Sequence, residues 1–226
     1  MIKLVLFDID GTLVHTGGAG IKAFARTFAT AFNAPNGVER IKFAGRTDVS
    51  LVREFMGLHG IPATPENFAL FFETYVFWLD HILQTSETRA CLGIFEFIRD
   101  LGTLPEPPRL GLLTGNIRLG AEIKLRHFGI WDVFEIGAFA DDHEDRNLIA
   151  RAAHERGRRL LNGNLNGDEI VVVGDTPHDV RCGRAIGAKV LAVATGGATL
   201  EELKRQEPDW VVDDMRALTA DAVCAR

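Results

Sequence analysis

The chain opens with MIKLVLFDIDGTLV, residues Met1 to Val14, and this stretch decides the fold. Its apolar run stops at Asp8, and Asp10, Gly11 and Thr12 follow within four residues. A short, nearly continuous run of β-prone residues is typical of a central parallel strand that is covered on both faces. Carboxylates at the carboxyl end of such a strand lie where open α/β sheets bind ligands. The opening therefore predicts a buried strand that presents two acids to a site.

Asp8 and Asp10 are separated by one residue, so their carboxylates repel each other unless a cation or a shared proton lies between them. A hard divalent cation is the simplest solution. Gly11 provides a conformationally free position for a sharp turn, and Thr12 adds a hydroxyl group or a helix cap. The alternative is that the two acids lie at the end of a strand without binding a cation. The later motifs decide between a cation site and this alternative.

Composition sets the limits for the class of protein. The 226 residues are 46% hydrophobic, which suits one large domain or a core with an insertion. A net charge of -6 argues against a general nucleic-acid binder, because counterion release needs clustered Lys and Arg. Three widely spaced cysteines without a CxxC pair suggest neither a disulfide framework nor a zinc site. With no export signal and no 18-residue apolar stretch, we expect a cytoplasmic protein without a membrane span.

Residues 15–86 change in character, because apolar residues recur there at three- and four-residue spacing. The segments 21–32, 50–58 and 65–83 are predicted to be helices whose aromatic stripes form a core rather than a cofactor site. Gly17, Gly18 and Gly20 precede them without a GxxxxGK[ST] or GxGxxG motif, which favours a hinge over a nucleotide loop. The sequence thus predicts an all-helical insertion directly after the first strand.

Two later strands also end in polar residues. RLGLLTGN predicts a buried strand that ends at Thr114, Gly115 and Asn116. EIVVVGDTPHDV predicts another that ends before Asp175, with Asp179 four residues further on. Four-residue spacing can bring both acids to one cation or its waters. Because parallel strands end at the same edge of a sheet, these groups are expected near Asp8.

Together these segments resemble the motifs of the haloacid dehalogenase-like phosphohydrolases. DIDGTLV is similar to the first motif, Thr114 stands where the second has Ser or Thr, and GDTPHDV is similar to the fourth, GDxxxD, in the form common among phosphoglycolate phosphatases. The resemblance implies that Asp8 attacks phosphorus and that Asp10 acts as acid and base. It implies a Mg2+ ion held by Asp8, the backbone carbonyl of Asp10, and Asp175, with Asp179 supporting the metal shell.

The same resemblance suggests two arginine roles. The third motif carries a basic residue before a helix, usually in Lys-Pro; this chain has neither, and Arg146 is the only Lys or Arg between Gly137 and Ala150. The alternative is a solvated Arg146 that pairs with the acids of DDHED. AGRTD resembles the loop by which caps of the phosphoglycolate phosphatase-like branch reach the active site, so Arg46 is a candidate substrate contact. Its alternative is an exposed arginine paired with Asp48.

We therefore expect an α/β protein: a doubly wound, Rossmann-like parallel core, residues 1–14 and 87–226, with a helical cap, residues 15–86. The expected function is Mg2+-dependent hydrolysis of a small phosphorylated metabolite through an aspartyl-phosphate, with Thr114, Gly115, Asn116 and Arg146 binding the phosphoryl group. Asp10 disfavours a dehalogenase, because dehalogenases of this superfamily lack that acid. A phosphosugar mutase, a catalytically silent phosphate-ligand-binding module and a phosphate-accepting regulatory domain remain as alternatives. The sequence indicates neither the substrate nor the oligomeric state.

Overall fold

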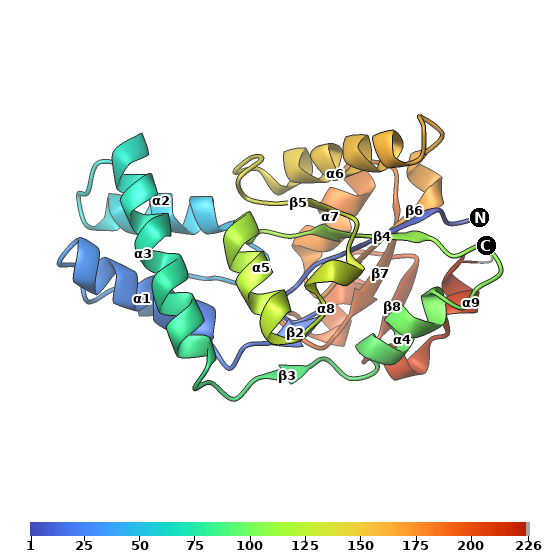
Figure 1. The fold of residues 1–226 in the computed structure, drawn as a ribbon, viewed down its shortest axis with the longest axis horizontal. Coiled ribbons are helices and arrows are strands. Elements are labelled where there is room, and N and C mark those ends of the chain that lie inside the picture. The colour runs from blue at the N-terminus through green and yellow to red at the C-terminus, as the bar shows by residue number, and fades with distance from the viewer. Residues whose placement is uncertain (225–226) are drawn as a thin grey trace.

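The computed structural model describes residues 1–224 and is built around a parallel sheet whose strands come from the whole length of the chain (Figure 1). Its strand order is β5-β4-β1-β6-β7-β8, and every neighbouring pair is parallel. The bounds are β1 Leu4–Phe7, β4 Arg109–Leu113, β5 Ile136–Ala138, β6 Ile170–Gly174, β7 Lys189–Val193 and β8 Trp210–Val212. The chain winds outward from β1 in both directions, so the predicted doubly wound α/β fold is confirmed.

Alternate residues of β1 face opposite layers of helices, as the two-residue period of a strand requires. Val5 and Phe7 pack in a cluster with α4 (Ile94–Leu101), α5 (Arg118–His127) and α9 (Ala220–Cys224). Leu4 and Leu6 pack instead against α6 (Arg146–Leu160) and α7 (Pro177–Ala185). The short helix α8 (Leu200–Lys204) follows β7. Both faces of the sheet are therefore buried, which explains why β1 is apolar at every position.

The register of the sheet aligns the ends of its central strands. Phe7 of β1 lies opposite Leu112 of β4 and Val173 of β6. Asp8 follows in β-pairing geometry, because its backbone N–H donates to the carbonyl of Val173 at 3.0 Å. The residues just beyond β1, β4 and β6 therefore meet at one edge of the sheet, as the polar strand ends in the sequence suggested.

A helical unit stands beside this edge (Figure 1). It comprises α1 (Ala19–Ala31), α2 (Asp48–Leu58) and α3 (Pro65–Leu83), with a 3-10 turn at Val38–Arg40. Thr47 and Thr64 cap the N-termini of α2 and α3 with their hydroxyl groups. The unit has a hydrophobic cluster of its own, centred on Phe28 and Phe55, whose rings stack at 4.1 Å. The aromatic stripes of the sequence thus form a core.

Two chain segments connect the helical unit to the sheet, and they lie side by side. Residues Val14–His15 (β2) pair antiparallel with Arg89–Ala90 (β3). Gly17 has a φ of 61°, and a β-carbon there would lie 2.7 Å from the carbonyl oxygen of Glu87. The glycine therefore permits both a left-handed turn and close contact between the connecting segments. Sequence periodicity did not predict this pair, because two-residue strands are too short to show a pattern.

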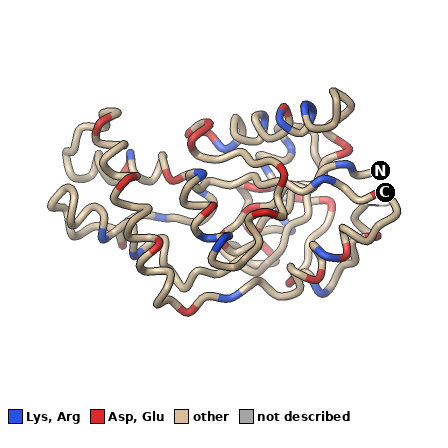
Figure 2. The backbone as a smooth tube through the Cα atoms, viewed as in Figure 1, with Lys and Arg blue, Asp and Glu red and all other residues tan. Residues whose placement is uncertain are grey.

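Three further 3-10 turns, Trp131–Val133, Gly167–Glu169 and Met215–Ala217, lie between the core elements. Residues of both charge signs occur in the helical unit as well as in the core (Figure 2). Within residues 1–224, no helix combines the length and the apolar character needed to cross a membrane.

Candidate active site

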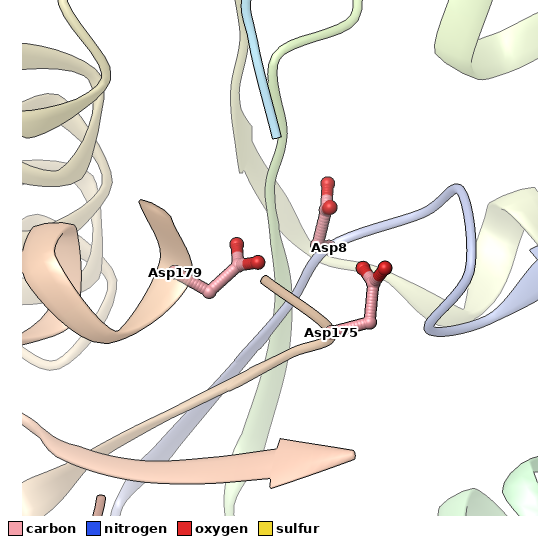
Figure 3. Close-up of side chains that lie close together, drawn as sticks. All are labelled: Asp8, Asp175 and Asp179. Atoms are coloured by element: carbon pink, nitrogen blue, oxygen red, sulfur yellow. The ribbon is translucent and has the colours of Figure 1, made fainter. Parts of the chain in front are cut away.

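Three carboxylates converge at the edge of the sheet (Figure 3). Asp8 follows β1, Asp175 follows β6, and Asp179 lies in the first turn of α7. All three residues are buried, and one oxygen of each lies within 4.8 Å of the others. Asp175 lies before the N-cap of α7, Thr176, and is therefore not part of the helix. Asp175 and Asp179 come together because the strand end and the first helical turn lie side by side, and not because they share one face of a helix.

The electrostatics of this cluster suit a cation. Burial is the main cause that raises the pKa of Asp8 to about 6, while Arg146 opposes the rise. Burial also raises the pKa of Asp175 to about 8, and the neighbouring Asp179 and Asp8 add to the effect. Fully ionised, the three buried acids and one arginine would carry a formal charge of −2, which a divalent cation would offset, and oxygen ligands at this separation match a hard divalent ion. The residues present therefore fit Mg2+.

Arg146 is the first residue of α6 and is only 7% exposed. Its Nη2 lies 3.2 Å from Asp8 Oδ2 and 2.5 Å from Asp179 Oδ1. Burial works against its charge, but the two carboxylates outweigh burial and hold the Arg146 pKa well above its ordinary value. The carboxylate partners of Arg146 are thus Asp8 and Asp179 of the site, and not the acids of the DDHED segment. Of those acids, Asp142, for example, pairs with Arg156.

Asp175 is held by backbone and hydroxyl groups from the opening loop and from the loop after β7. Thr12 Oγ donates to Asp175 Oδ1 at 3.1 Å, and the N–H of Gly197 donates to Oδ2. Gly11 has a φ of 84°, and a β-carbon there would lie 2.6 Å from Asp175 Oδ2. Gly11 is therefore needed both for the turn and for the approach of the Asp175 carboxylate.

Asp10 faces a second polar group of residues, from the segment after β4 and from α5. Asn116 Nδ2 donates to Asp10 Oδ2 at 2.9 Å and to Thr114 Oγ at 2.9 Å. Lys124 Nζ donates to the same Asp10 oxygen at 2.6 Å and to Asn116 Oδ1 at 2.5 Å. The Asp10 side chain is 44% exposed, whereas that of Lys124 is 4% exposed. Asp10 thus combines a fixed position with access to solvent.

The loop before α2 approaches this edge of the sheet from the helical unit. The N–H of Asp48 donates to the carbonyl of Gly115 at 2.7 Å, and Asp48 Oδ2 accepts from the N–H of Ile117 at 2.8 Å. Arg46 does not pair with Asp48: its guanidinium binds the Glu54 carboxylate and donates to the carbonyl of Ser50 at 3.3 Å. The sequence-based alternative for Arg46 named the wrong partner, because Asp48 is occupied by the backbone of the core.

A cavity of about 510 Å³ joins these groups. Its walls include Asp8, Asp10, Asp175 and Arg146 from the core, and Arg46, Phe24 and Tyr75 from the helical unit. Gly115 and Asn116 also line it, while Thr114 is fully buried behind Asn116. The cavity therefore has a charged floor and a partly apolar roof.

Lys124 and Asp48 were not identified as site residues from the sequence. A signal for Lys124 did exist: it shares the buried stripe of α5 with Gly120, Ala121 and Leu125. A lysine on such a stripe is unusual, because lysines are almost never fully buried unless paired. Its partner, however, lies 114 positions away in the chain.

Comparisons with known proteins identify similar sequences along almost the whole chain. A sequence model described as haloacid dehalogenase-like hydrolase matches residues 5–193. The pyrophosphatase PpaX of Bacillus pumilus is 28% identical over 221 residues, covering 97% of this chain and 95% of the relative. The probable phosphatase IndB of Dickeya dadantii is 25% identical over 223 residues, covering 94% and 90%.

Solved structures agree on the fold. CbbY from Rhodobacter sphaeroides in complex with phosphate superposes with a TM-score of 0.74 at 20% identity, over 95% of each chain. A predicted phosphoglycolate phosphatase from Haemophilus somnus gives a TM-score of 0.73 at 20% identity, over 98% of this chain and 96% of that one.

The chain therefore belongs to the haloacid dehalogenase-like hydrolase family. Within that family it is a phosphatase.

Proposed function

We propose that the protein hydrolyses a small phosphorylated metabolite in a Mg2+-dependent reaction that passes through an aspartyl-phosphate on Asp8. The observation that carries the proposal is the convergence of Asp8, Asp175, Asp179 and Arg146 beside Asp10 on the floor of one cavity. The helical unit, residues 15–86, is proposed to act as a cap over a core formed by residues 1–14 and 87–226.

Asp8 and Asp175 would hold the metal through their carboxylates, and Asp10 would hold it through its backbone carbonyl, with Asp179 in the surrounding shell. When bound, Mg2+ supplies positive charge that offsets the repulsion between the Asp8 carboxylate and an anionic phosphoryl group. Arg146 contributes a second, permanent positive charge beside Asp8, and its contact with Asp179 keeps it there.

In the first step, an Asp8 oxygen forms a bond to phosphorus while the bond from phosphorus to the leaving-group oxygen breaks. That oxygen takes a proton from Asp10, so the leaving group departs protonated and Asp10 becomes a carboxylate. In the second step, water gives a proton to Asp10 and its oxygen forms a bond to phosphorus, while the bond between phosphorus and the Asp8 oxygen breaks. Inorganic phosphate is released, and Asp8 is again a free carboxylate. Asn116 and Lys124 bind the same Asp10 oxygen, so the carboxyl group is held in one orientation for both transfers.

Thr114, Gly115 and Asn116 are proposed to steady the phosphoryl oxygens, and Arg46 to contact the rest of the substrate. Gly115 and Asn116 line the cavity directly. Thr114 Oγ accepts from the N–H and the Nδ2 of Asn116, so its own hydrogen stays available as a donor. Arg46 lines the cavity too, but it would have to share or leave its ion pair with Glu54 to bind an anion.

The test compares wild type and Asp8→Asn on a panel of small phosphomonoesters and pyrophosphate, with and without Mg2+. We expect wild-type hydrolysis to require Mg2+ and Asp8→Asn to lose at least about a thousandfold in kcat. Asp132→Asn, which removes an acid that is 86% exposed, is the control and should match wild type. Mass spectrometry should find a phosphorylated Asp8 in trapped wild-type enzyme. A folded Asp8→Asn enzyme with wild-type turnover would refute the covalent mechanism.

A further inference from the structure

The cavity has more room than a phosphoryl group and a metal ion need. Its volume of about 510 Å³ is in the range of sites that enclose whole small molecules. In the proposed reaction, on which this inference rests, the phosphoryl group lies beside Asp8 and the leaving-group oxygen lies beside Asp10. The remainder of the substrate therefore extends from Asp10 into the rest of the cavity. The residues that line this part select among leaving groups.

The paired connecting strands β2 and β3 form a part of the cavity wall, between the helical unit and the core (Figure 1). Asp10 forms a β-bridge with Val14, the first residue of β2. His15 follows and lies directly opposite Arg89 of β3. Directly opposite residues of an antiparallel pair project from the same face, and both of these residues line the cavity. In the strand pairing, β2 alone therefore separates Arg89 from the segment that carries Asp10.

Four lysine and arginine side chains line the cavity, and they differ in their partners. Three of them are paired with carboxylates of the protein, namely Arg146 with Asp8 and Asp179, Lys124 with Asp10, and Arg46 with Glu54. Within residues 1–224, the fourth, Arg89, has no carboxylate at ion-pair distance. An anion can therefore bind Arg89 without displacing a carboxylate of the protein.

His15 and Glu87 are the titratable neighbours of Arg89 on this wall. Burial is the main cause that lowers the pKa of His15 below 6.5, and the positive charge of Arg89 lowers it further. His15 is therefore mainly uncharged at neutral pH and offers a hydrogen bond rather than a charge. Glu87 lies two positions before Arg89 and, in the described part of the chain, forms no ion pair with it. The permanent positive charge of the wall is thus that of Arg89, and Glu87 opposes it.

We propose that Arg89 determines specificity by binding an anionic group at the far end of the leaving group, either a carboxylate or a second phosphoryl group. A guanidinium group binds both kinds of anion with two parallel hydrogen bonds. The preferred substrates are then small phosphomonoesters whose leaving group carries a second negative group. Phosphomonoesters with neutral leaving groups are poorer substrates, because they leave Arg89 without a partner in the cavity.

The first experiment measures wild-type kcat/KM with Mg2+ for two pairs of compounds that differ in charge at the end of the leaving group. The pair 3-phosphoglycerate and glycerol 3-phosphate compares a carboxylate with a neutral hydroxymethyl group. The pair 1,3-propanediol bisphosphate and 3-hydroxypropyl phosphate compares a second phosphoryl group with a hydroxyl group. The anionic member of at least one pair should be favoured about tenfold or more, and the pair with the larger preference identifies the anion.

Variants then test whether Arg89 causes the preference. Arg89→Met should lose about tenfold or more on the anionic member relative to the neutral member. Arg89→Lys should keep a part of the preference, because the charge remains and the planar fork is lost. Glu87→Gln should raise the preference, because it removes a negative charge from the same wall. Arg99→Met, which removes an arginine outside the cavity with a 69% exposed side chain, is the matched control and should leave the preference unchanged.

Binding separates recognition from chemistry. In an Asp8→Asn background, calorimetric titration with Mg2+ and the favoured anionic compound should show a Kd about tenfold weaker when Arg89→Met is added. The neutral member of the pair should be affected much less. Thermal denaturation checks that the variants are folded, and Arg89→Gln replaces the Met variant if it is not. Equal losses on both members, an unchanged ratio, or a lower preference in Glu87→Gln would each overturn the role of Arg89.

A failure of the proposed function gives a different result. Phenyl phosphate, whose leaving group carries no anionic group, tests the phosphatase activity by itself. If the wild-type enzyme hydrolyses neither phenyl phosphate nor any of the other compounds with Mg2+, the proposed function and this inference fall together. If it hydrolyses them without preference for an anionic leaving group, or with a preference that does not depend on Arg89, the phosphatase mechanism stands and only the role of Arg89 is refuted.

Discussion

Gly115 and Arg46 approach each other so closely that a β-carbon on Gly115 would lie 2.2 Å from the carbonyl oxygen of Arg46. The two residues belong to the edge of the sheet and to the loop of the helical unit, and the neighbouring Asp48 N–H donates to the Gly115 carbonyl at 2.7 Å. Because backbone meets backbone at this point, neither side can make room by rotating a side chain. The contact therefore fixes how near the loop carrying Arg46 comes to the phosphoryl-binding residues.

Gly115→Ala should push the loop away from the core and weaken both stability and catalysis. We expect a loss of about 1–3 kcal/mol in the free energy of unfolding, typical of overpacking, and a lower kcat/KM. Chemical denaturation and steady-state kinetics measure the two effects. Gly57→Ala is the control, because Gly57 lies in α2 and an added β-carbon there would have nothing within 4 Å. This substitution should raise the free energy of unfolding by about 0.5–1 kcal/mol. A Gly115→Ala protein indistinguishable from wild type would show that the contact carries no constraint.

Arg146→Ala should damage the site more than Arg146→Lys. The alanine variant leaves Asp8 and Asp179 buried without their cation, so we expect a loss of about 3–5 kcal/mol in stability together with loss of activity. Lysine restores the charge but not the planar guanidinium, so it should recover part of both. Melting temperatures and kcat report the result, with the exposed Arg151→Ala on the same helix as control. Near-wild-type kinetics for Arg146→Ala would mean that another residue fills the role.

Arg46→Ala tests whether the helical unit distinguishes substrates. We expect kcat/KM to fall strongly for a substrate with an anionic or hydroxylated tail and much less for a generic aryl phosphate, which has no tail to bind. Glu54→Gln should have the opposite effect on the tailed substrate, because it releases the Arg46 guanidinium from its ion pair. Arg40→Ala, which removes an arginine whose side chain is 77% exposed, is the control. Equal losses on both substrates would assign Arg46 to closure or chemistry instead.

The buried carboxyl group of Asp48 should make the free energy of unfolding depend on pH. Burial is the main cause that raises its pKa from 3.8 to about 6; Asp10 and Asp141 add to the rise, whereas Lys124 and the bond from Ile117 N–H oppose it. Tyr75 also faces this carboxyl group. Because the folded protein holds this proton more tightly than the unfolded chain, the contribution of Asp48 is greatest below pH 4 and falls as pH rises from about 4 to 6.

Replacing this carboxyl group by an uncharged amide should remove that dependence. Asp48→Asn should match wild type near pH 4 and exceed it in free energy of unfolding by about 1–3 kcal/mol at pH 7.5. Urea denaturation at both pH values measures the difference, and the exposed Asp80→Asn controls for the loss of one charge. A variant less stable than wild type at pH 7.5 would show that the ionised carboxylate is favourable in the fold.

Local sequence was sufficient to predict a part of the site where one segment contains both the apolar run of a strand and the polar residue that follows it. The apolar run before Asp8 and the run before Asp175 each predict a buried strand and its polar end, because strand identity and strand terminus depend on neighbouring residues. Spacing of three and four residues likewise predicted the helices of residues 15–86. Arg146 could be singled out because it begins a helix in a segment without other basic residues.

Contacts between distant segments were decided only by the tertiary structure. Lys124 meets Asp10 because the winding of the sheet brings α5 beside the end of β1, across 114 positions of sequence. Asp48 binds the backbone near Gly115, and Arg46 turns to Glu54, because the helical unit docks on the core at that point. Sequence periodicity determines which face of each element is buried, whereas the polar partner across an interface depends on strand order and on docking, which no single segment encodes.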